Sequence, residues 1–515
     1  MRKNQLAFVL GTTALIATVG VLPAASFAAN NTTRTVFVAG GATLPALAYM
    51  GKAFTGTNPK FATAAVAGSV FAFALPSGDS IQYCQTGSGY GKKTMDGAAN
   101  SANPPTMLSQ EAENLTCATG TPVAGTNGFQ GPQTGTGFPD SDPDIAASDA
   151  PFTINGTTDE YDIFQTNKHL AGCCGGVQPD RNEVVQLPEI VGAVGMMYND
   201  PDLTTQPNLT PAQICSVVNG TVTTWHGLGI GPNNGRLINF VYRADGSGTT
   251  FSFSNFLVNN ALSKCAVNVS QQFTGGTGTV VVKNAPPLSA SASGNGSVTT
   301  CIAAGTNCAT GIGGSGTENG HLYGSLGYVE EANILGSPSL NVAKGIFYTK
   351  VNNKDPKLNL PEAANTIPAG TKLVFDKEVE TNGGAATLVA PGDAIPHAKC
   401  LLVVDPTNAY GNITTGYPIL AVSNLDFSYS DNGAGNTTAL QDIARALVNP
   451  NTVFANGFKI GAVTGGGAAQ IKTVDAATPT AGKGTTGYST LGSVYADSGT
   501  TKGPISTAAV ACINS

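Results

Sequence analysis

Residues 241–250 read Val-Tyr-Arg-Ala-Asp-Gly-Ser-Gly-Thr-Thr, with an apolar start followed by a turn rich in Gly and Ser. β-branched and aromatic residues before Arg243 are typical of a strand, and Gly and Ser are typical of turns. Beyond the turn, apolar residues fall near helical spacing and form one face: Phe253, Phe256, Leu257 and Leu262. The stretch therefore predicts a strand that runs through a turn of small residues into a helix.

Two earlier stretches have the same order of strand, small-residue turn and helix start. Residues 36–45 read Val-Phe-Val-Ala-Gly-Gly-Ala-Thr-Leu-Pro, where Thr43 is suited to cap a helix and Pro45 to its first turn. Residues 83–91 read Tyr-Cys-Gln-Thr-Gly-Ser-Gly-Tyr-Gly. Further strand-like runs bring the set to 35–39, 184–187, 237–242, 372–375, 401–404 and 419–422. Because such runs alternate with helical patterns, the sequence predicts an α/β fold.

The composition excludes several classes of protein. Of the 515 residues, 41% are hydrophobic and 11% are charged, against roughly 25% charged in an average soluble protein. A coiled coil and a charged disordered tail both need dense Glu, Lys and Arg, so neither fits. The net charge of −7 argues against a nucleic-acid binder, which needs a basic surface. With 65 Gly and 30 Pro, the chain is predicted to be globular, rich in loops and exported.

The N-terminus has the three parts of a secretory signal peptide. Two basic residues stand at the start, residues 6–22 are apolar, and Ser26-Phe27-Ala28 is a small-x-small cleavage signal. We therefore predict a signal peptide over residues 1–28 and a mature chain that starts near Ala29. The alternative is an N-terminal membrane anchor, although Gly and Pro weaken the stretch as a spanning helix. No later segment approaches the roughly 20 apolar residues of such a helix, so the predicted location is periplasmic or secreted.

Ten cysteines fit an exported protein, because disulfides persist in oxidising compartments. The even count allows five disulfides, and spacing does not fix their pairing. We favour Cys215–Cys265, Cys301–Cys308 and Cys400–Cys512, with the other four pairing among themselves: Cys84, Cys117, Cys173 and Cys174. The alternative is a metal site of His169 with Cys173 and Cys174. That group lacks CxxC spacing and a second ligand pair, so the sequence predicts no metal and no cofactor.

Long polar segments interrupt the pattern of strands and helices. Structureless loops of such length are uncommon in compact domains. We interpret the segments as insertions, with small hairpins of their own, that decorate a simpler core. They lie at 92–144, 155–182, 270–320 and 351–399.

The three strand-to-helix turns share a chemistry that suits an anion. A helix N-terminus presents unpaired N–H groups and a partial positive charge. Glycine allows close approach of the backbone, and Ser and Thr hydroxyls donate hydrogen bonds. Arg243 adds a planar guanidinium that matches two oxygens of a tetrahedral anion, and Asp245 is placed to hold it. The alternative stays open, because Gly, Ser and Thr are common in turns before helices.

Asp149 adds a test of which anion would fit; it ends the run Asp-Ile-Ala-Ala-Ser-Asp at 144–149. A carboxylate repels an anion unless the anion carries a proton that the carboxylate can accept. At neutral pH phosphate keeps such a proton and sulfate does not, so a buried carboxylate would reject sulfate. The alternative is that Asp149 is a helix cap or a turn residue.

Taken together, these motifs resemble those of the periplasmic phosphate-binding protein family. The family comprises PstS-like solute receptors of the phosphate ABC transporter and DING-type phosphate-binding proteins. The matching motifs occur in the family's order: Gly40-Gly41-Ala42-Thr43-Leu44-Pro45, Gly87-Ser88-Gly89, Ala147-Ser148-Asp149-Ala150-Pro151 and the run at 243–250. Further matches lie at 209–225, 326–330 and 415–420. The resemblance covers about residues 36–430, omits the long insertions and is weak over the C-terminal tail.

The resemblance implies a two-lobed periplasmic-binding-protein fold of type II, decorated by the long Gly/Thr-rich insertions. Lobe 1 would comprise residues 29–196 and 417–515, and lobe 2 would comprise residues 197–416. The chain would cross between the lobes near 196–199 and return near 417–422, with the anion held between them.

By motif match, the resemblance also implies a set of phosphate-binding residues. These are Thr43, Leu44, Ser88, Asp149, Arg243, Asp245, Ser247, Gly248 and Thr249. Asp149 would accept the phosphate proton and Arg243, oriented by Asp245, would pair with the oxygens. The others would donate hydrogen bonds, Leu44 through its backbone. Two departures stand out, since Leu44 replaces an aromatic residue and Tyr90 stands where a small residue is usual.

The sequence therefore predicts an exported, non-enzymatic protein that captures inorganic phosphate for uptake or scavenging. Arsenate is the expected competitor and an ABC permease the implied partner, with membrane contact only through that permease and no nucleic acid. One alternative is a secreted phosphatase of the DING type, although the chain lacks GxSxG and its histidines (169, 226, 321, 397) lack metal-binding spacing. Another is a surface or appendage role, motivated by the Gly/Thr/Asn-rich insertions.

Overall fold

The protein is described here by a computed structural model. It describes residues 36–51, 61–62, 64–65, 69–74, 79–95, 144–155, 158–161, 184–275, 279–308, 316–318, 321–369, 373–381, 384–390, 397–429, 432, 434–446, 488–491 and 501–514. The predicted signal peptide lies outside these residues. Within them, no helix combines the length and the apolar character needed to cross a membrane.

A twelve-stranded mixed sheet forms the centre of the molecule. Its main path, in spatial order, is β10 (Ser289–Ala292), β9 (Leu237–Arg243), β12 (His321–Glu330), β7 (Val184–Asn199), β19 (Leu420–Ser428), β4 (Ile145–Ser148), β1 (Val36–Gly41), β3 (Ser80–Cys84) and β2 (Phe61–Ala62). Off this path, β7 also pairs with β13 (Ile346–Tyr348) and β20 (Tyr488–Thr490), and β12 pairs with β11 (Gly316–Glu318). β9 pairs in parallel with β10 and β12, and β1 pairs in parallel with β3 and β4. These parallel strands, joined through helices, confirm the predicted α/β class.

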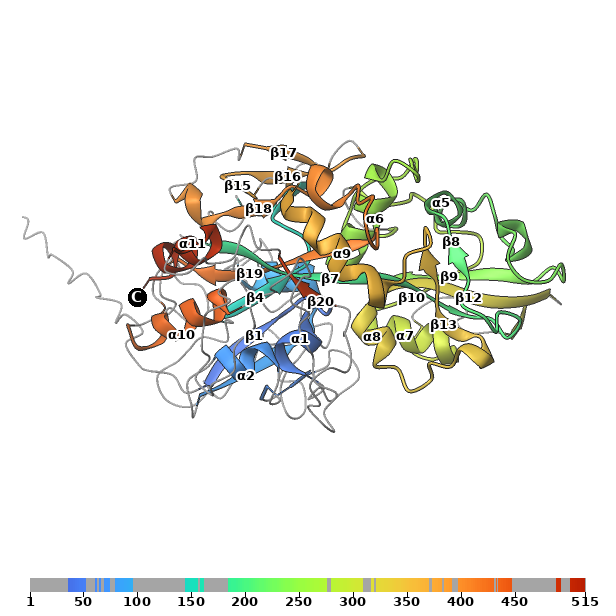
Figure 1. The fold of residues 1–515 in the computed structure, drawn as a ribbon, viewed down its shortest axis with the longest axis horizontal. Coiled ribbons are helices and arrows are strands. Elements are labelled where there is room, and N and C mark those ends of the chain that lie inside the picture. Colours follow the sequence, from blue (N-terminus) through green and yellow to red (C-terminus); the bar gives the residue numbers. More distant parts are fainter. Residues whose placement is uncertain are drawn as a thin grey trace, which may run out of the picture.

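Strand β7 connects two halves of the molecule (Figure 1). Its sixteen residues are buried throughout. Residues 184–193 pair with β19, and residues 194–199 pair with β12. The chain returns beside this point, where Val194 N–H donates to the Ile419 carbonyl at 3.0 Å and the Tyr417 hydroxyl donates to the Val194 carbonyl at 2.8 Å. A fully buried strand needs apolar residues on both faces, which explains the long run of Val, Ile, Ala and Met.

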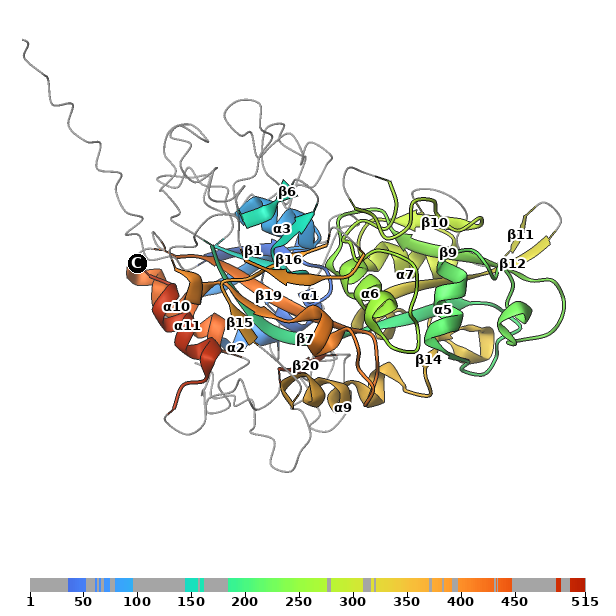
Figure 2. The same ribbon diagram turned by 90° about the horizontal axis from the view of Figure 1, so that it is seen from above.

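The two halves are distinct groups of elements in both views (Figures 1 and 2). The first half contains β1, β3 and β4 with α1 (Ala46–Met50), α2 (Val70–Ala74), α3 (Ser88–Met95), α10 (Ala434–Arg445) and α11 (Pro504–Cys512). The second half contains β9, β10 and β12 with α5 (Pro211–Val218), α6 (Gly248–Asn259), α7 (Asn295–Ala304) and α8 (Glu331–Leu335). In Figure 2, α6 and α7 lie on the side of the second half that faces the first.

Each of the six runs predicted as a strand overlaps a strand of the structure. Two of these strands are much longer than predicted. The runs at 184–187 and 419–422 are only the starts of β7 and β19. The others correspond to β1, β9, β15 (Leu373–Phe375) and β18 (Leu402–Val404). The short prediction for β7 arose because Pro188, Glu189 and three glycines or alanines interrupt its β-branched pattern, while burial on both faces holds the strand together.

The predicted insertions differ in what the structure describes. Segments 92–144 and 155–182 lie almost wholly outside the described residues. Segment 270–320 is not only an insertion, because β10 pairs in parallel with β9 and α7 follows it. Segment 351–399 holds α9 (Pro356–Ala369) as well as β15, β16 (Glu378–Glu380) and β17 (Thr387–Val389).

One part of the predicted second lobe pairs with the first half. Strand β16 runs parallel to β5 (Thr153–Asn155), with Val379 opposite Thr153, and Leu401 forms a bridge with Gln186 of β7. The Gln186 side chain donates to the Leu402 carbonyl at 2.9 Å. Strand β16 and residues 401–402 therefore contact the first half. The lobe boundaries at 196 and 417 stay predictions.

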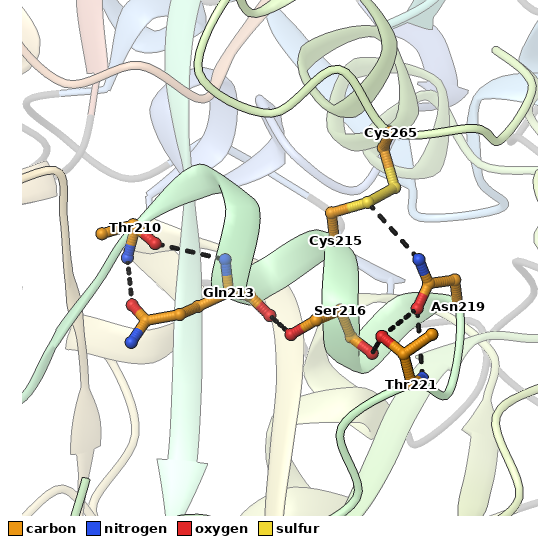
Figure 3. The surroundings of a disulfide bond; sticks show 7 residues. All are labelled: Thr210, Gln213, Cys215, Ser216, Asn219, Thr221 and Cys265. Atoms are coloured by element: carbon orange, nitrogen blue, oxygen red, sulfur yellow. Dashed lines mark hydrogen bonds between the residues drawn. A yellow bond between two sulfur atoms is a disulfide. The ribbon is translucent and has the colours of Figure 1, made fainter. Parts of the chain in front are cut away.

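Three disulfides confirm the favoured pairings: Cys215–Cys265, Cys301–Cys308 and Cys400–Cys512. Figure 3 shows the first, which joins α5 to the segment after α6; the Asn219 amide donates to Cys215 Sγ at 3.7 Å. In the same view, a capping box formed by Thr210 and Gln213 starts α5. Cys84 is also disulfide-bonded. Cys117, Cys173 and Cys174 lie outside the described residues, so the predicted pairing among these four stays a prediction.

Candidate anion-binding site

Four strand-to-helix turns meet where the two halves face each other. From the first half come the turns β1 to α1 and β3 to α3, and from the second half come β9 to α6 and β10 to α7. Three were predicted, and the fourth lies within the segment interpreted as an insertion. Within each half, the carboxyl ends of the parallel strands place both turns at one edge. The strands of the two halves run in opposite directions, so these two edges face each other.

Arg243, the last residue of β9, joins the halves. Only 2% of this residue is exposed. Its Nε donates to Asp245 Oδ1 at 2.7 Å, and its Nη2 forms an ion pair with the other carboxylate oxygen. Asp245 raises the pKa of Arg243, so the guanidinium remains charged despite its burial. Its Nη1 is directed at neutral oxygens: Thr43 Oγ1 at 3.3 Å, Thr249 Oγ1 at 3.4 Å and Asn295 Oδ1 at 3.2 Å.

Two threonine hydroxyls, one from each half, are oriented by the same pair of donors. Thr43 Oγ1 accepts from Arg243 and from Asn295 Nδ2 at 2.9 Å. Thr249 Oγ1 accepts from Arg243 and from Asn295 Nδ2 at 3.2 Å. Both residues are buried. With its lone pairs engaged in this way, each hydroxyl still has its own hydrogen to donate, which suits it to an oxyanion.

Asp149, directly after β4, places a carboxyl group in the same cluster. Ser423 Oγ donates to its Oδ1 at 2.5 Å and Ser88 Oγ to its Oδ2 at 3.3 Å, while Asp149 N–H donates to Ser88 Oγ at 3.0 Å. Burial raises the pKa of Asp149 to about 7. The bond from Ser423, the charge of Arg243 and the bond from Ser88 oppose that rise in the pKa. This carboxyl group therefore changes charge near neutral pH.

Glycines allow the two halves to approach. A Cβ on Gly248, the first residue of α6, would lie 2.5 Å from both Asp149 Cβ and Ser88 Oγ. A Cβ on Gly87, whose φ is +91°, would lie 2.9 Å from Asp245 Oδ2. Side chains at these two positions would push the second half away from the first. This explains physically why both turns carry glycine.

The structure gathers most of the predicted site residues and gives two of them other side-chain roles. Thr43, Ser88, Asp149, Arg243, Asp245, Gly248 and Thr249 lie in the cluster described above. The Ser247 hydroxyl caps α6 by accepting from Thr250 N–H at 3.1 Å. The Leu44 side chain packs in the core against Gly192 of β7. The side chain of Tyr90, the second departure from the family pattern, is not among those that the structure describes.

Sequence reasoning missed two contributors, Asn295 and Ser423. Asn295 opens α7 within Ser-Ala-Ser-Ala-Ser-Gly-Asn-Gly at 289–296, a fourth strand-to-turn sequence that the low hydrophobicity of β10 concealed. Ser423 interrupts the apolar run of β19. A polar residue within a fully buried strand is the signal that could have found it.

The alternative metal site falls outside the described residues, since His169, Cys173 and Cys174 are not among them. Across the described ranges, no group of three or more His, Cys, Asp or Glu side chains is arranged to hold a metal ion.

A short stretch of the chain is similar to a curated protein, alkaline phosphatase L of Pseudomonas aeruginosa. The two are 35% identical over 85 residues, which cover 16% of this chain and 23% of that protein. The chain thus matches about a quarter of that relative's length.

Solved structures are similar over longer stretches. A high affinity periplasmic phosphate-binding protein (PfluDING) bound with phosphate is 20% identical, with a TM-score of 0.45 over 79% of this chain and 84% of that chain. A phosphate-binding protein from Stenotrophomonas maltophilia is 19% identical, with a TM-score of 0.44 over 80% of this chain and 84% of that chain. A family model described as a PBP superfamily domain matches residues 29–377, more than half of the chain. This chain therefore belongs to the PBP superfamily.

Proposed function

We propose that this protein is an exported solute-binding protein that captures inorganic phosphate between its two halves, for uptake or scavenging. The observation that carries the proposal is that Asp149 and Arg243 share one buried cluster with hydroxyls from both halves. The residues proposed to bind phosphate are Thr43, Leu44, Ser88, Asp149, Arg243, Asp245, Ser247, Gly248 and Thr249, to which we add Asn295.

The donors in this cluster suit a tetrahedral oxyanion. The Arg243 guanidinium supplies charge, and the hydroxyls of Thr43, Thr249 and Ser88 supply hydrogen bonds. The first turn of α6 leaves N–H groups unpaired within the helix and adds a partial positive charge. A net-acidic protein can hold an anion with such groups, since most of them are dipoles.

Asp149 supports the choice of phosphate over sulfate. When ionised, it accepts a hydrogen bond from an anion that carries a proton and repels one that does not. Arsenate has the shape and protons of phosphate, so we expect it to compete. The predicted signal peptide and the superfamily support a periplasmic or secreted location and an ABC permease as partner.

Calorimetric titration of ligand-stripped protein tests the proposal. We expect tight binding of phosphate, displacement by arsenate and no heat from sulfate at pH 8. Asp149→Asn removes the acceptor charge, and we expect weaker phosphate binding together with measurable sulfate binding. Wild-type protein that ignores phosphate, or an Asp149→Asn variant with unchanged affinities for both anions, would contradict the proposed site.

A second candidate is a secreted phosphatase, favoured by the short match to alkaline phosphatase L. Ser88 and Asp149 would then act as nucleophile and base, since Ser88 Oγ donates to Asp149 Oδ2 at 3.3 Å. Hydrolysis of a chromogenic phosphate ester by pure protein, lost in Ser88→Ala, would support this function. No turnover by protein that binds phosphate would exclude it.

A further inference from the structure

We infer that Ser423 is a positioning and specificity-determining residue of this site: it holds one oxygen of Asp149 and thereby keeps the carboxyl group in the form that admits phosphate and rejects sulfate. This inference rests on the proposed function. Ser423 lies on β19, the strand through which the chain returns to the first half. It is fully buried, as is Asp149.

The two oxygens of Asp149 have unequal partners. Oδ1 accepts the short 2.5 Å bond from Ser423, whereas Oδ2 accepts only a long 3.3 Å contact from Ser88. The Ser88 hydroxyl is itself an acceptor for Asp149 N–H, so its hydrogen can turn from Oδ2 to an anion. Ser423 therefore fixes the rotation of the carboxyl group and leaves Oδ2 as the acceptor for the proton of the anion.

An irregularity in the pairing of β7 with β19 lies beside this contact. The register shifts between Ser423 and Asn424, whose partners are Ile190 and Pro188, so that Glu189 is the extra residue of a bulge in β7. Consecutive side chains of a regular strand point to opposite faces. Here Ser423 bonds to the Asp149 side chain and Asn424 Nδ2 bonds to the Ser148 carbonyl at 3.2 Å. Both therefore reach the end of β4.

The groups around Asp149 show why one hydroxyl is important. Arg243 of β9 supplies a cation, Ser88 of α3 supplies a weak hydrogen bond, and three tyrosines experience the charge of Asp149: Tyr49, Tyr83 and Tyr410. Burial raises the pKa of Asp149, and Ser423 is the largest influence that lowers it. Without Ser423, more of the carboxyl groups would be protonated at neutral pH. A protonated carboxyl group donates a hydrogen bond, so it would accept sulfate as a ligand.

The test compares wild type, Ser423→Ala, Ser423→Thr and Ser428→Ala. Ser428 is the matched control, because it is a buried serine of the same strand whose hydroxyl has no partner among the described residues. Carboxyl ¹³C NMR of ligand-stripped protein, with Asp149→Asn for assignment, gives the titration midpoint of Asp149. Calorimetry between pH 6 and 9 gives the affinities for phosphate and for sulfate.

We expect Ser423→Ala to raise the midpoint by about one pH unit, equivalent to about 1.36 kcal/mol, because the variant loses a hydrogen bond to the ionised carboxylate. The phosphate-to-sulfate affinity ratio at pH 7.5 should fall about tenfold. Ser423→Thr keeps the hydroxyl and should restore both, and Ser428→Ala should match wild type. An unchanged midpoint and ratio in Ser423→Ala, or equal shifts in Ser428→Ala, would overturn the inference. Absence of phosphate binding by wild type would instead reject the proposed function.

Discussion

An arginine stands at each end of β9, and the two have opposite surroundings. Arg236, just before the strand, pairs through Nε with Asp200 at 3.1 Å and with Asp202 at 2.8 Å. Arg243, at the carboxyl end, pairs with one acidic residue of the described part of the chain, Asp245, and directs Nη1 at three neutral oxygens. Two carboxylates face the single charge of Arg236, whereas one carboxylate holds Arg243 and leaves its Nη1 directed at neutral oxygens. Both arginines are buried, so the number of acidic partners, rather than burial, is what distinguishes them.

The largest effect should come from removing each arginine. Arg243→Ala deletes a charged, multiply bonded donor, and hydrogen bonds to charged groups contribute about 1.5–3 kcal/mol each, so phosphate affinity should fall about 100-fold or more. Arg236→Ala should leave affinity within about threefold, because this end of β9 lacks the donors of the site. Calorimetry measures both, and Arg243→Lys tests charge without the planar fork. Equal losses of phosphate affinity in the two alanine variants would contradict the distinction between Arg243 and Arg236.

The next test uses two glycines, one close to Asp149 at the carboxyl end of β9 and one close to Asp200 at the amino end of β9. A methyl group in Gly248→Ala would meet Asp149 Cβ at 2.5 Å, and one in Gly324→Ala would meet Asp200 Oδ2 at 2.8 Å. The first clash lies between the halves, so we expect phosphate affinity to fall about 30-fold, since overpacking costs about 1–3 kcal/mol. The second lies within one half and should lower the melting temperature without changing affinity. Reversal of this pattern, measured by calorimetry and thermal unfolding, would argue against closure around the anion.

An asparagine also lies near the arginine at each end of β9. Asn295→Ala removes the amide that orients Thr43 and Thr249, and we expect about fivefold weaker phosphate binding because a buried hydrogen bond contributes about 1 kcal/mol. Asn234 donates to Asp202 at 2.6 Å at the other end, and Asn234→Ala should bind like wild type. If both variants bind with unchanged affinity, Asn295 has no part in the site.

The smallest effect is on stability and depends on pH. Burial raises the pKa of Asp149 to about 7 and that of Asp200 to about 6, whereas an unfolded Asp ionises near pH 3.9. Between these values the folded protein binds more protons than the unfolded chain, so the free energy of unfolding falls as pH rises. Ligand-free Asp149→Asn should therefore gain a few degrees in melting temperature over wild type as pH rises from 5 to 8. Asp200→Asn should gain less in melting temperature, because the lower pKa of Asp200 means that its loss of stability with rising pH ends at a lower pH. Differences that are constant with pH would contradict these assignments.

Local sequence predicted most of the fold and most residues that the structure brings together in the cluster around Arg243. Strand-like runs ending in Gly/Ser turns located β1, β3 and β9, and Arg243 with Asp245 followed from a cation beside its counter-ion. Local patterns could not predict which strands pair with each other, or which residues far apart in the sequence come into contact. β10 consists of Ser and Ala and pairs with β9. Because such a sequence does not look like a strand, no predicted strand-to-helix turn pointed to Asn295. Ser423 is only one hydroxyl on a strand, and its contact with Asp149 spans 274 positions of sequence.

The cancellation of Arg243 by Asp245 has a consequence for how an anion arrives. The site presents little net charge, and the whole chain carries −7, so no electric field draws the ligand in from a distance. Encounter is left to diffusion against a weakly repelling surface. Dissolved salt screens that repulsion, so added salt should quicken association, whereas it slows receptors that rely on basic surfaces. On this basis, association with an anion should not weaken in brackish water relative to fresh.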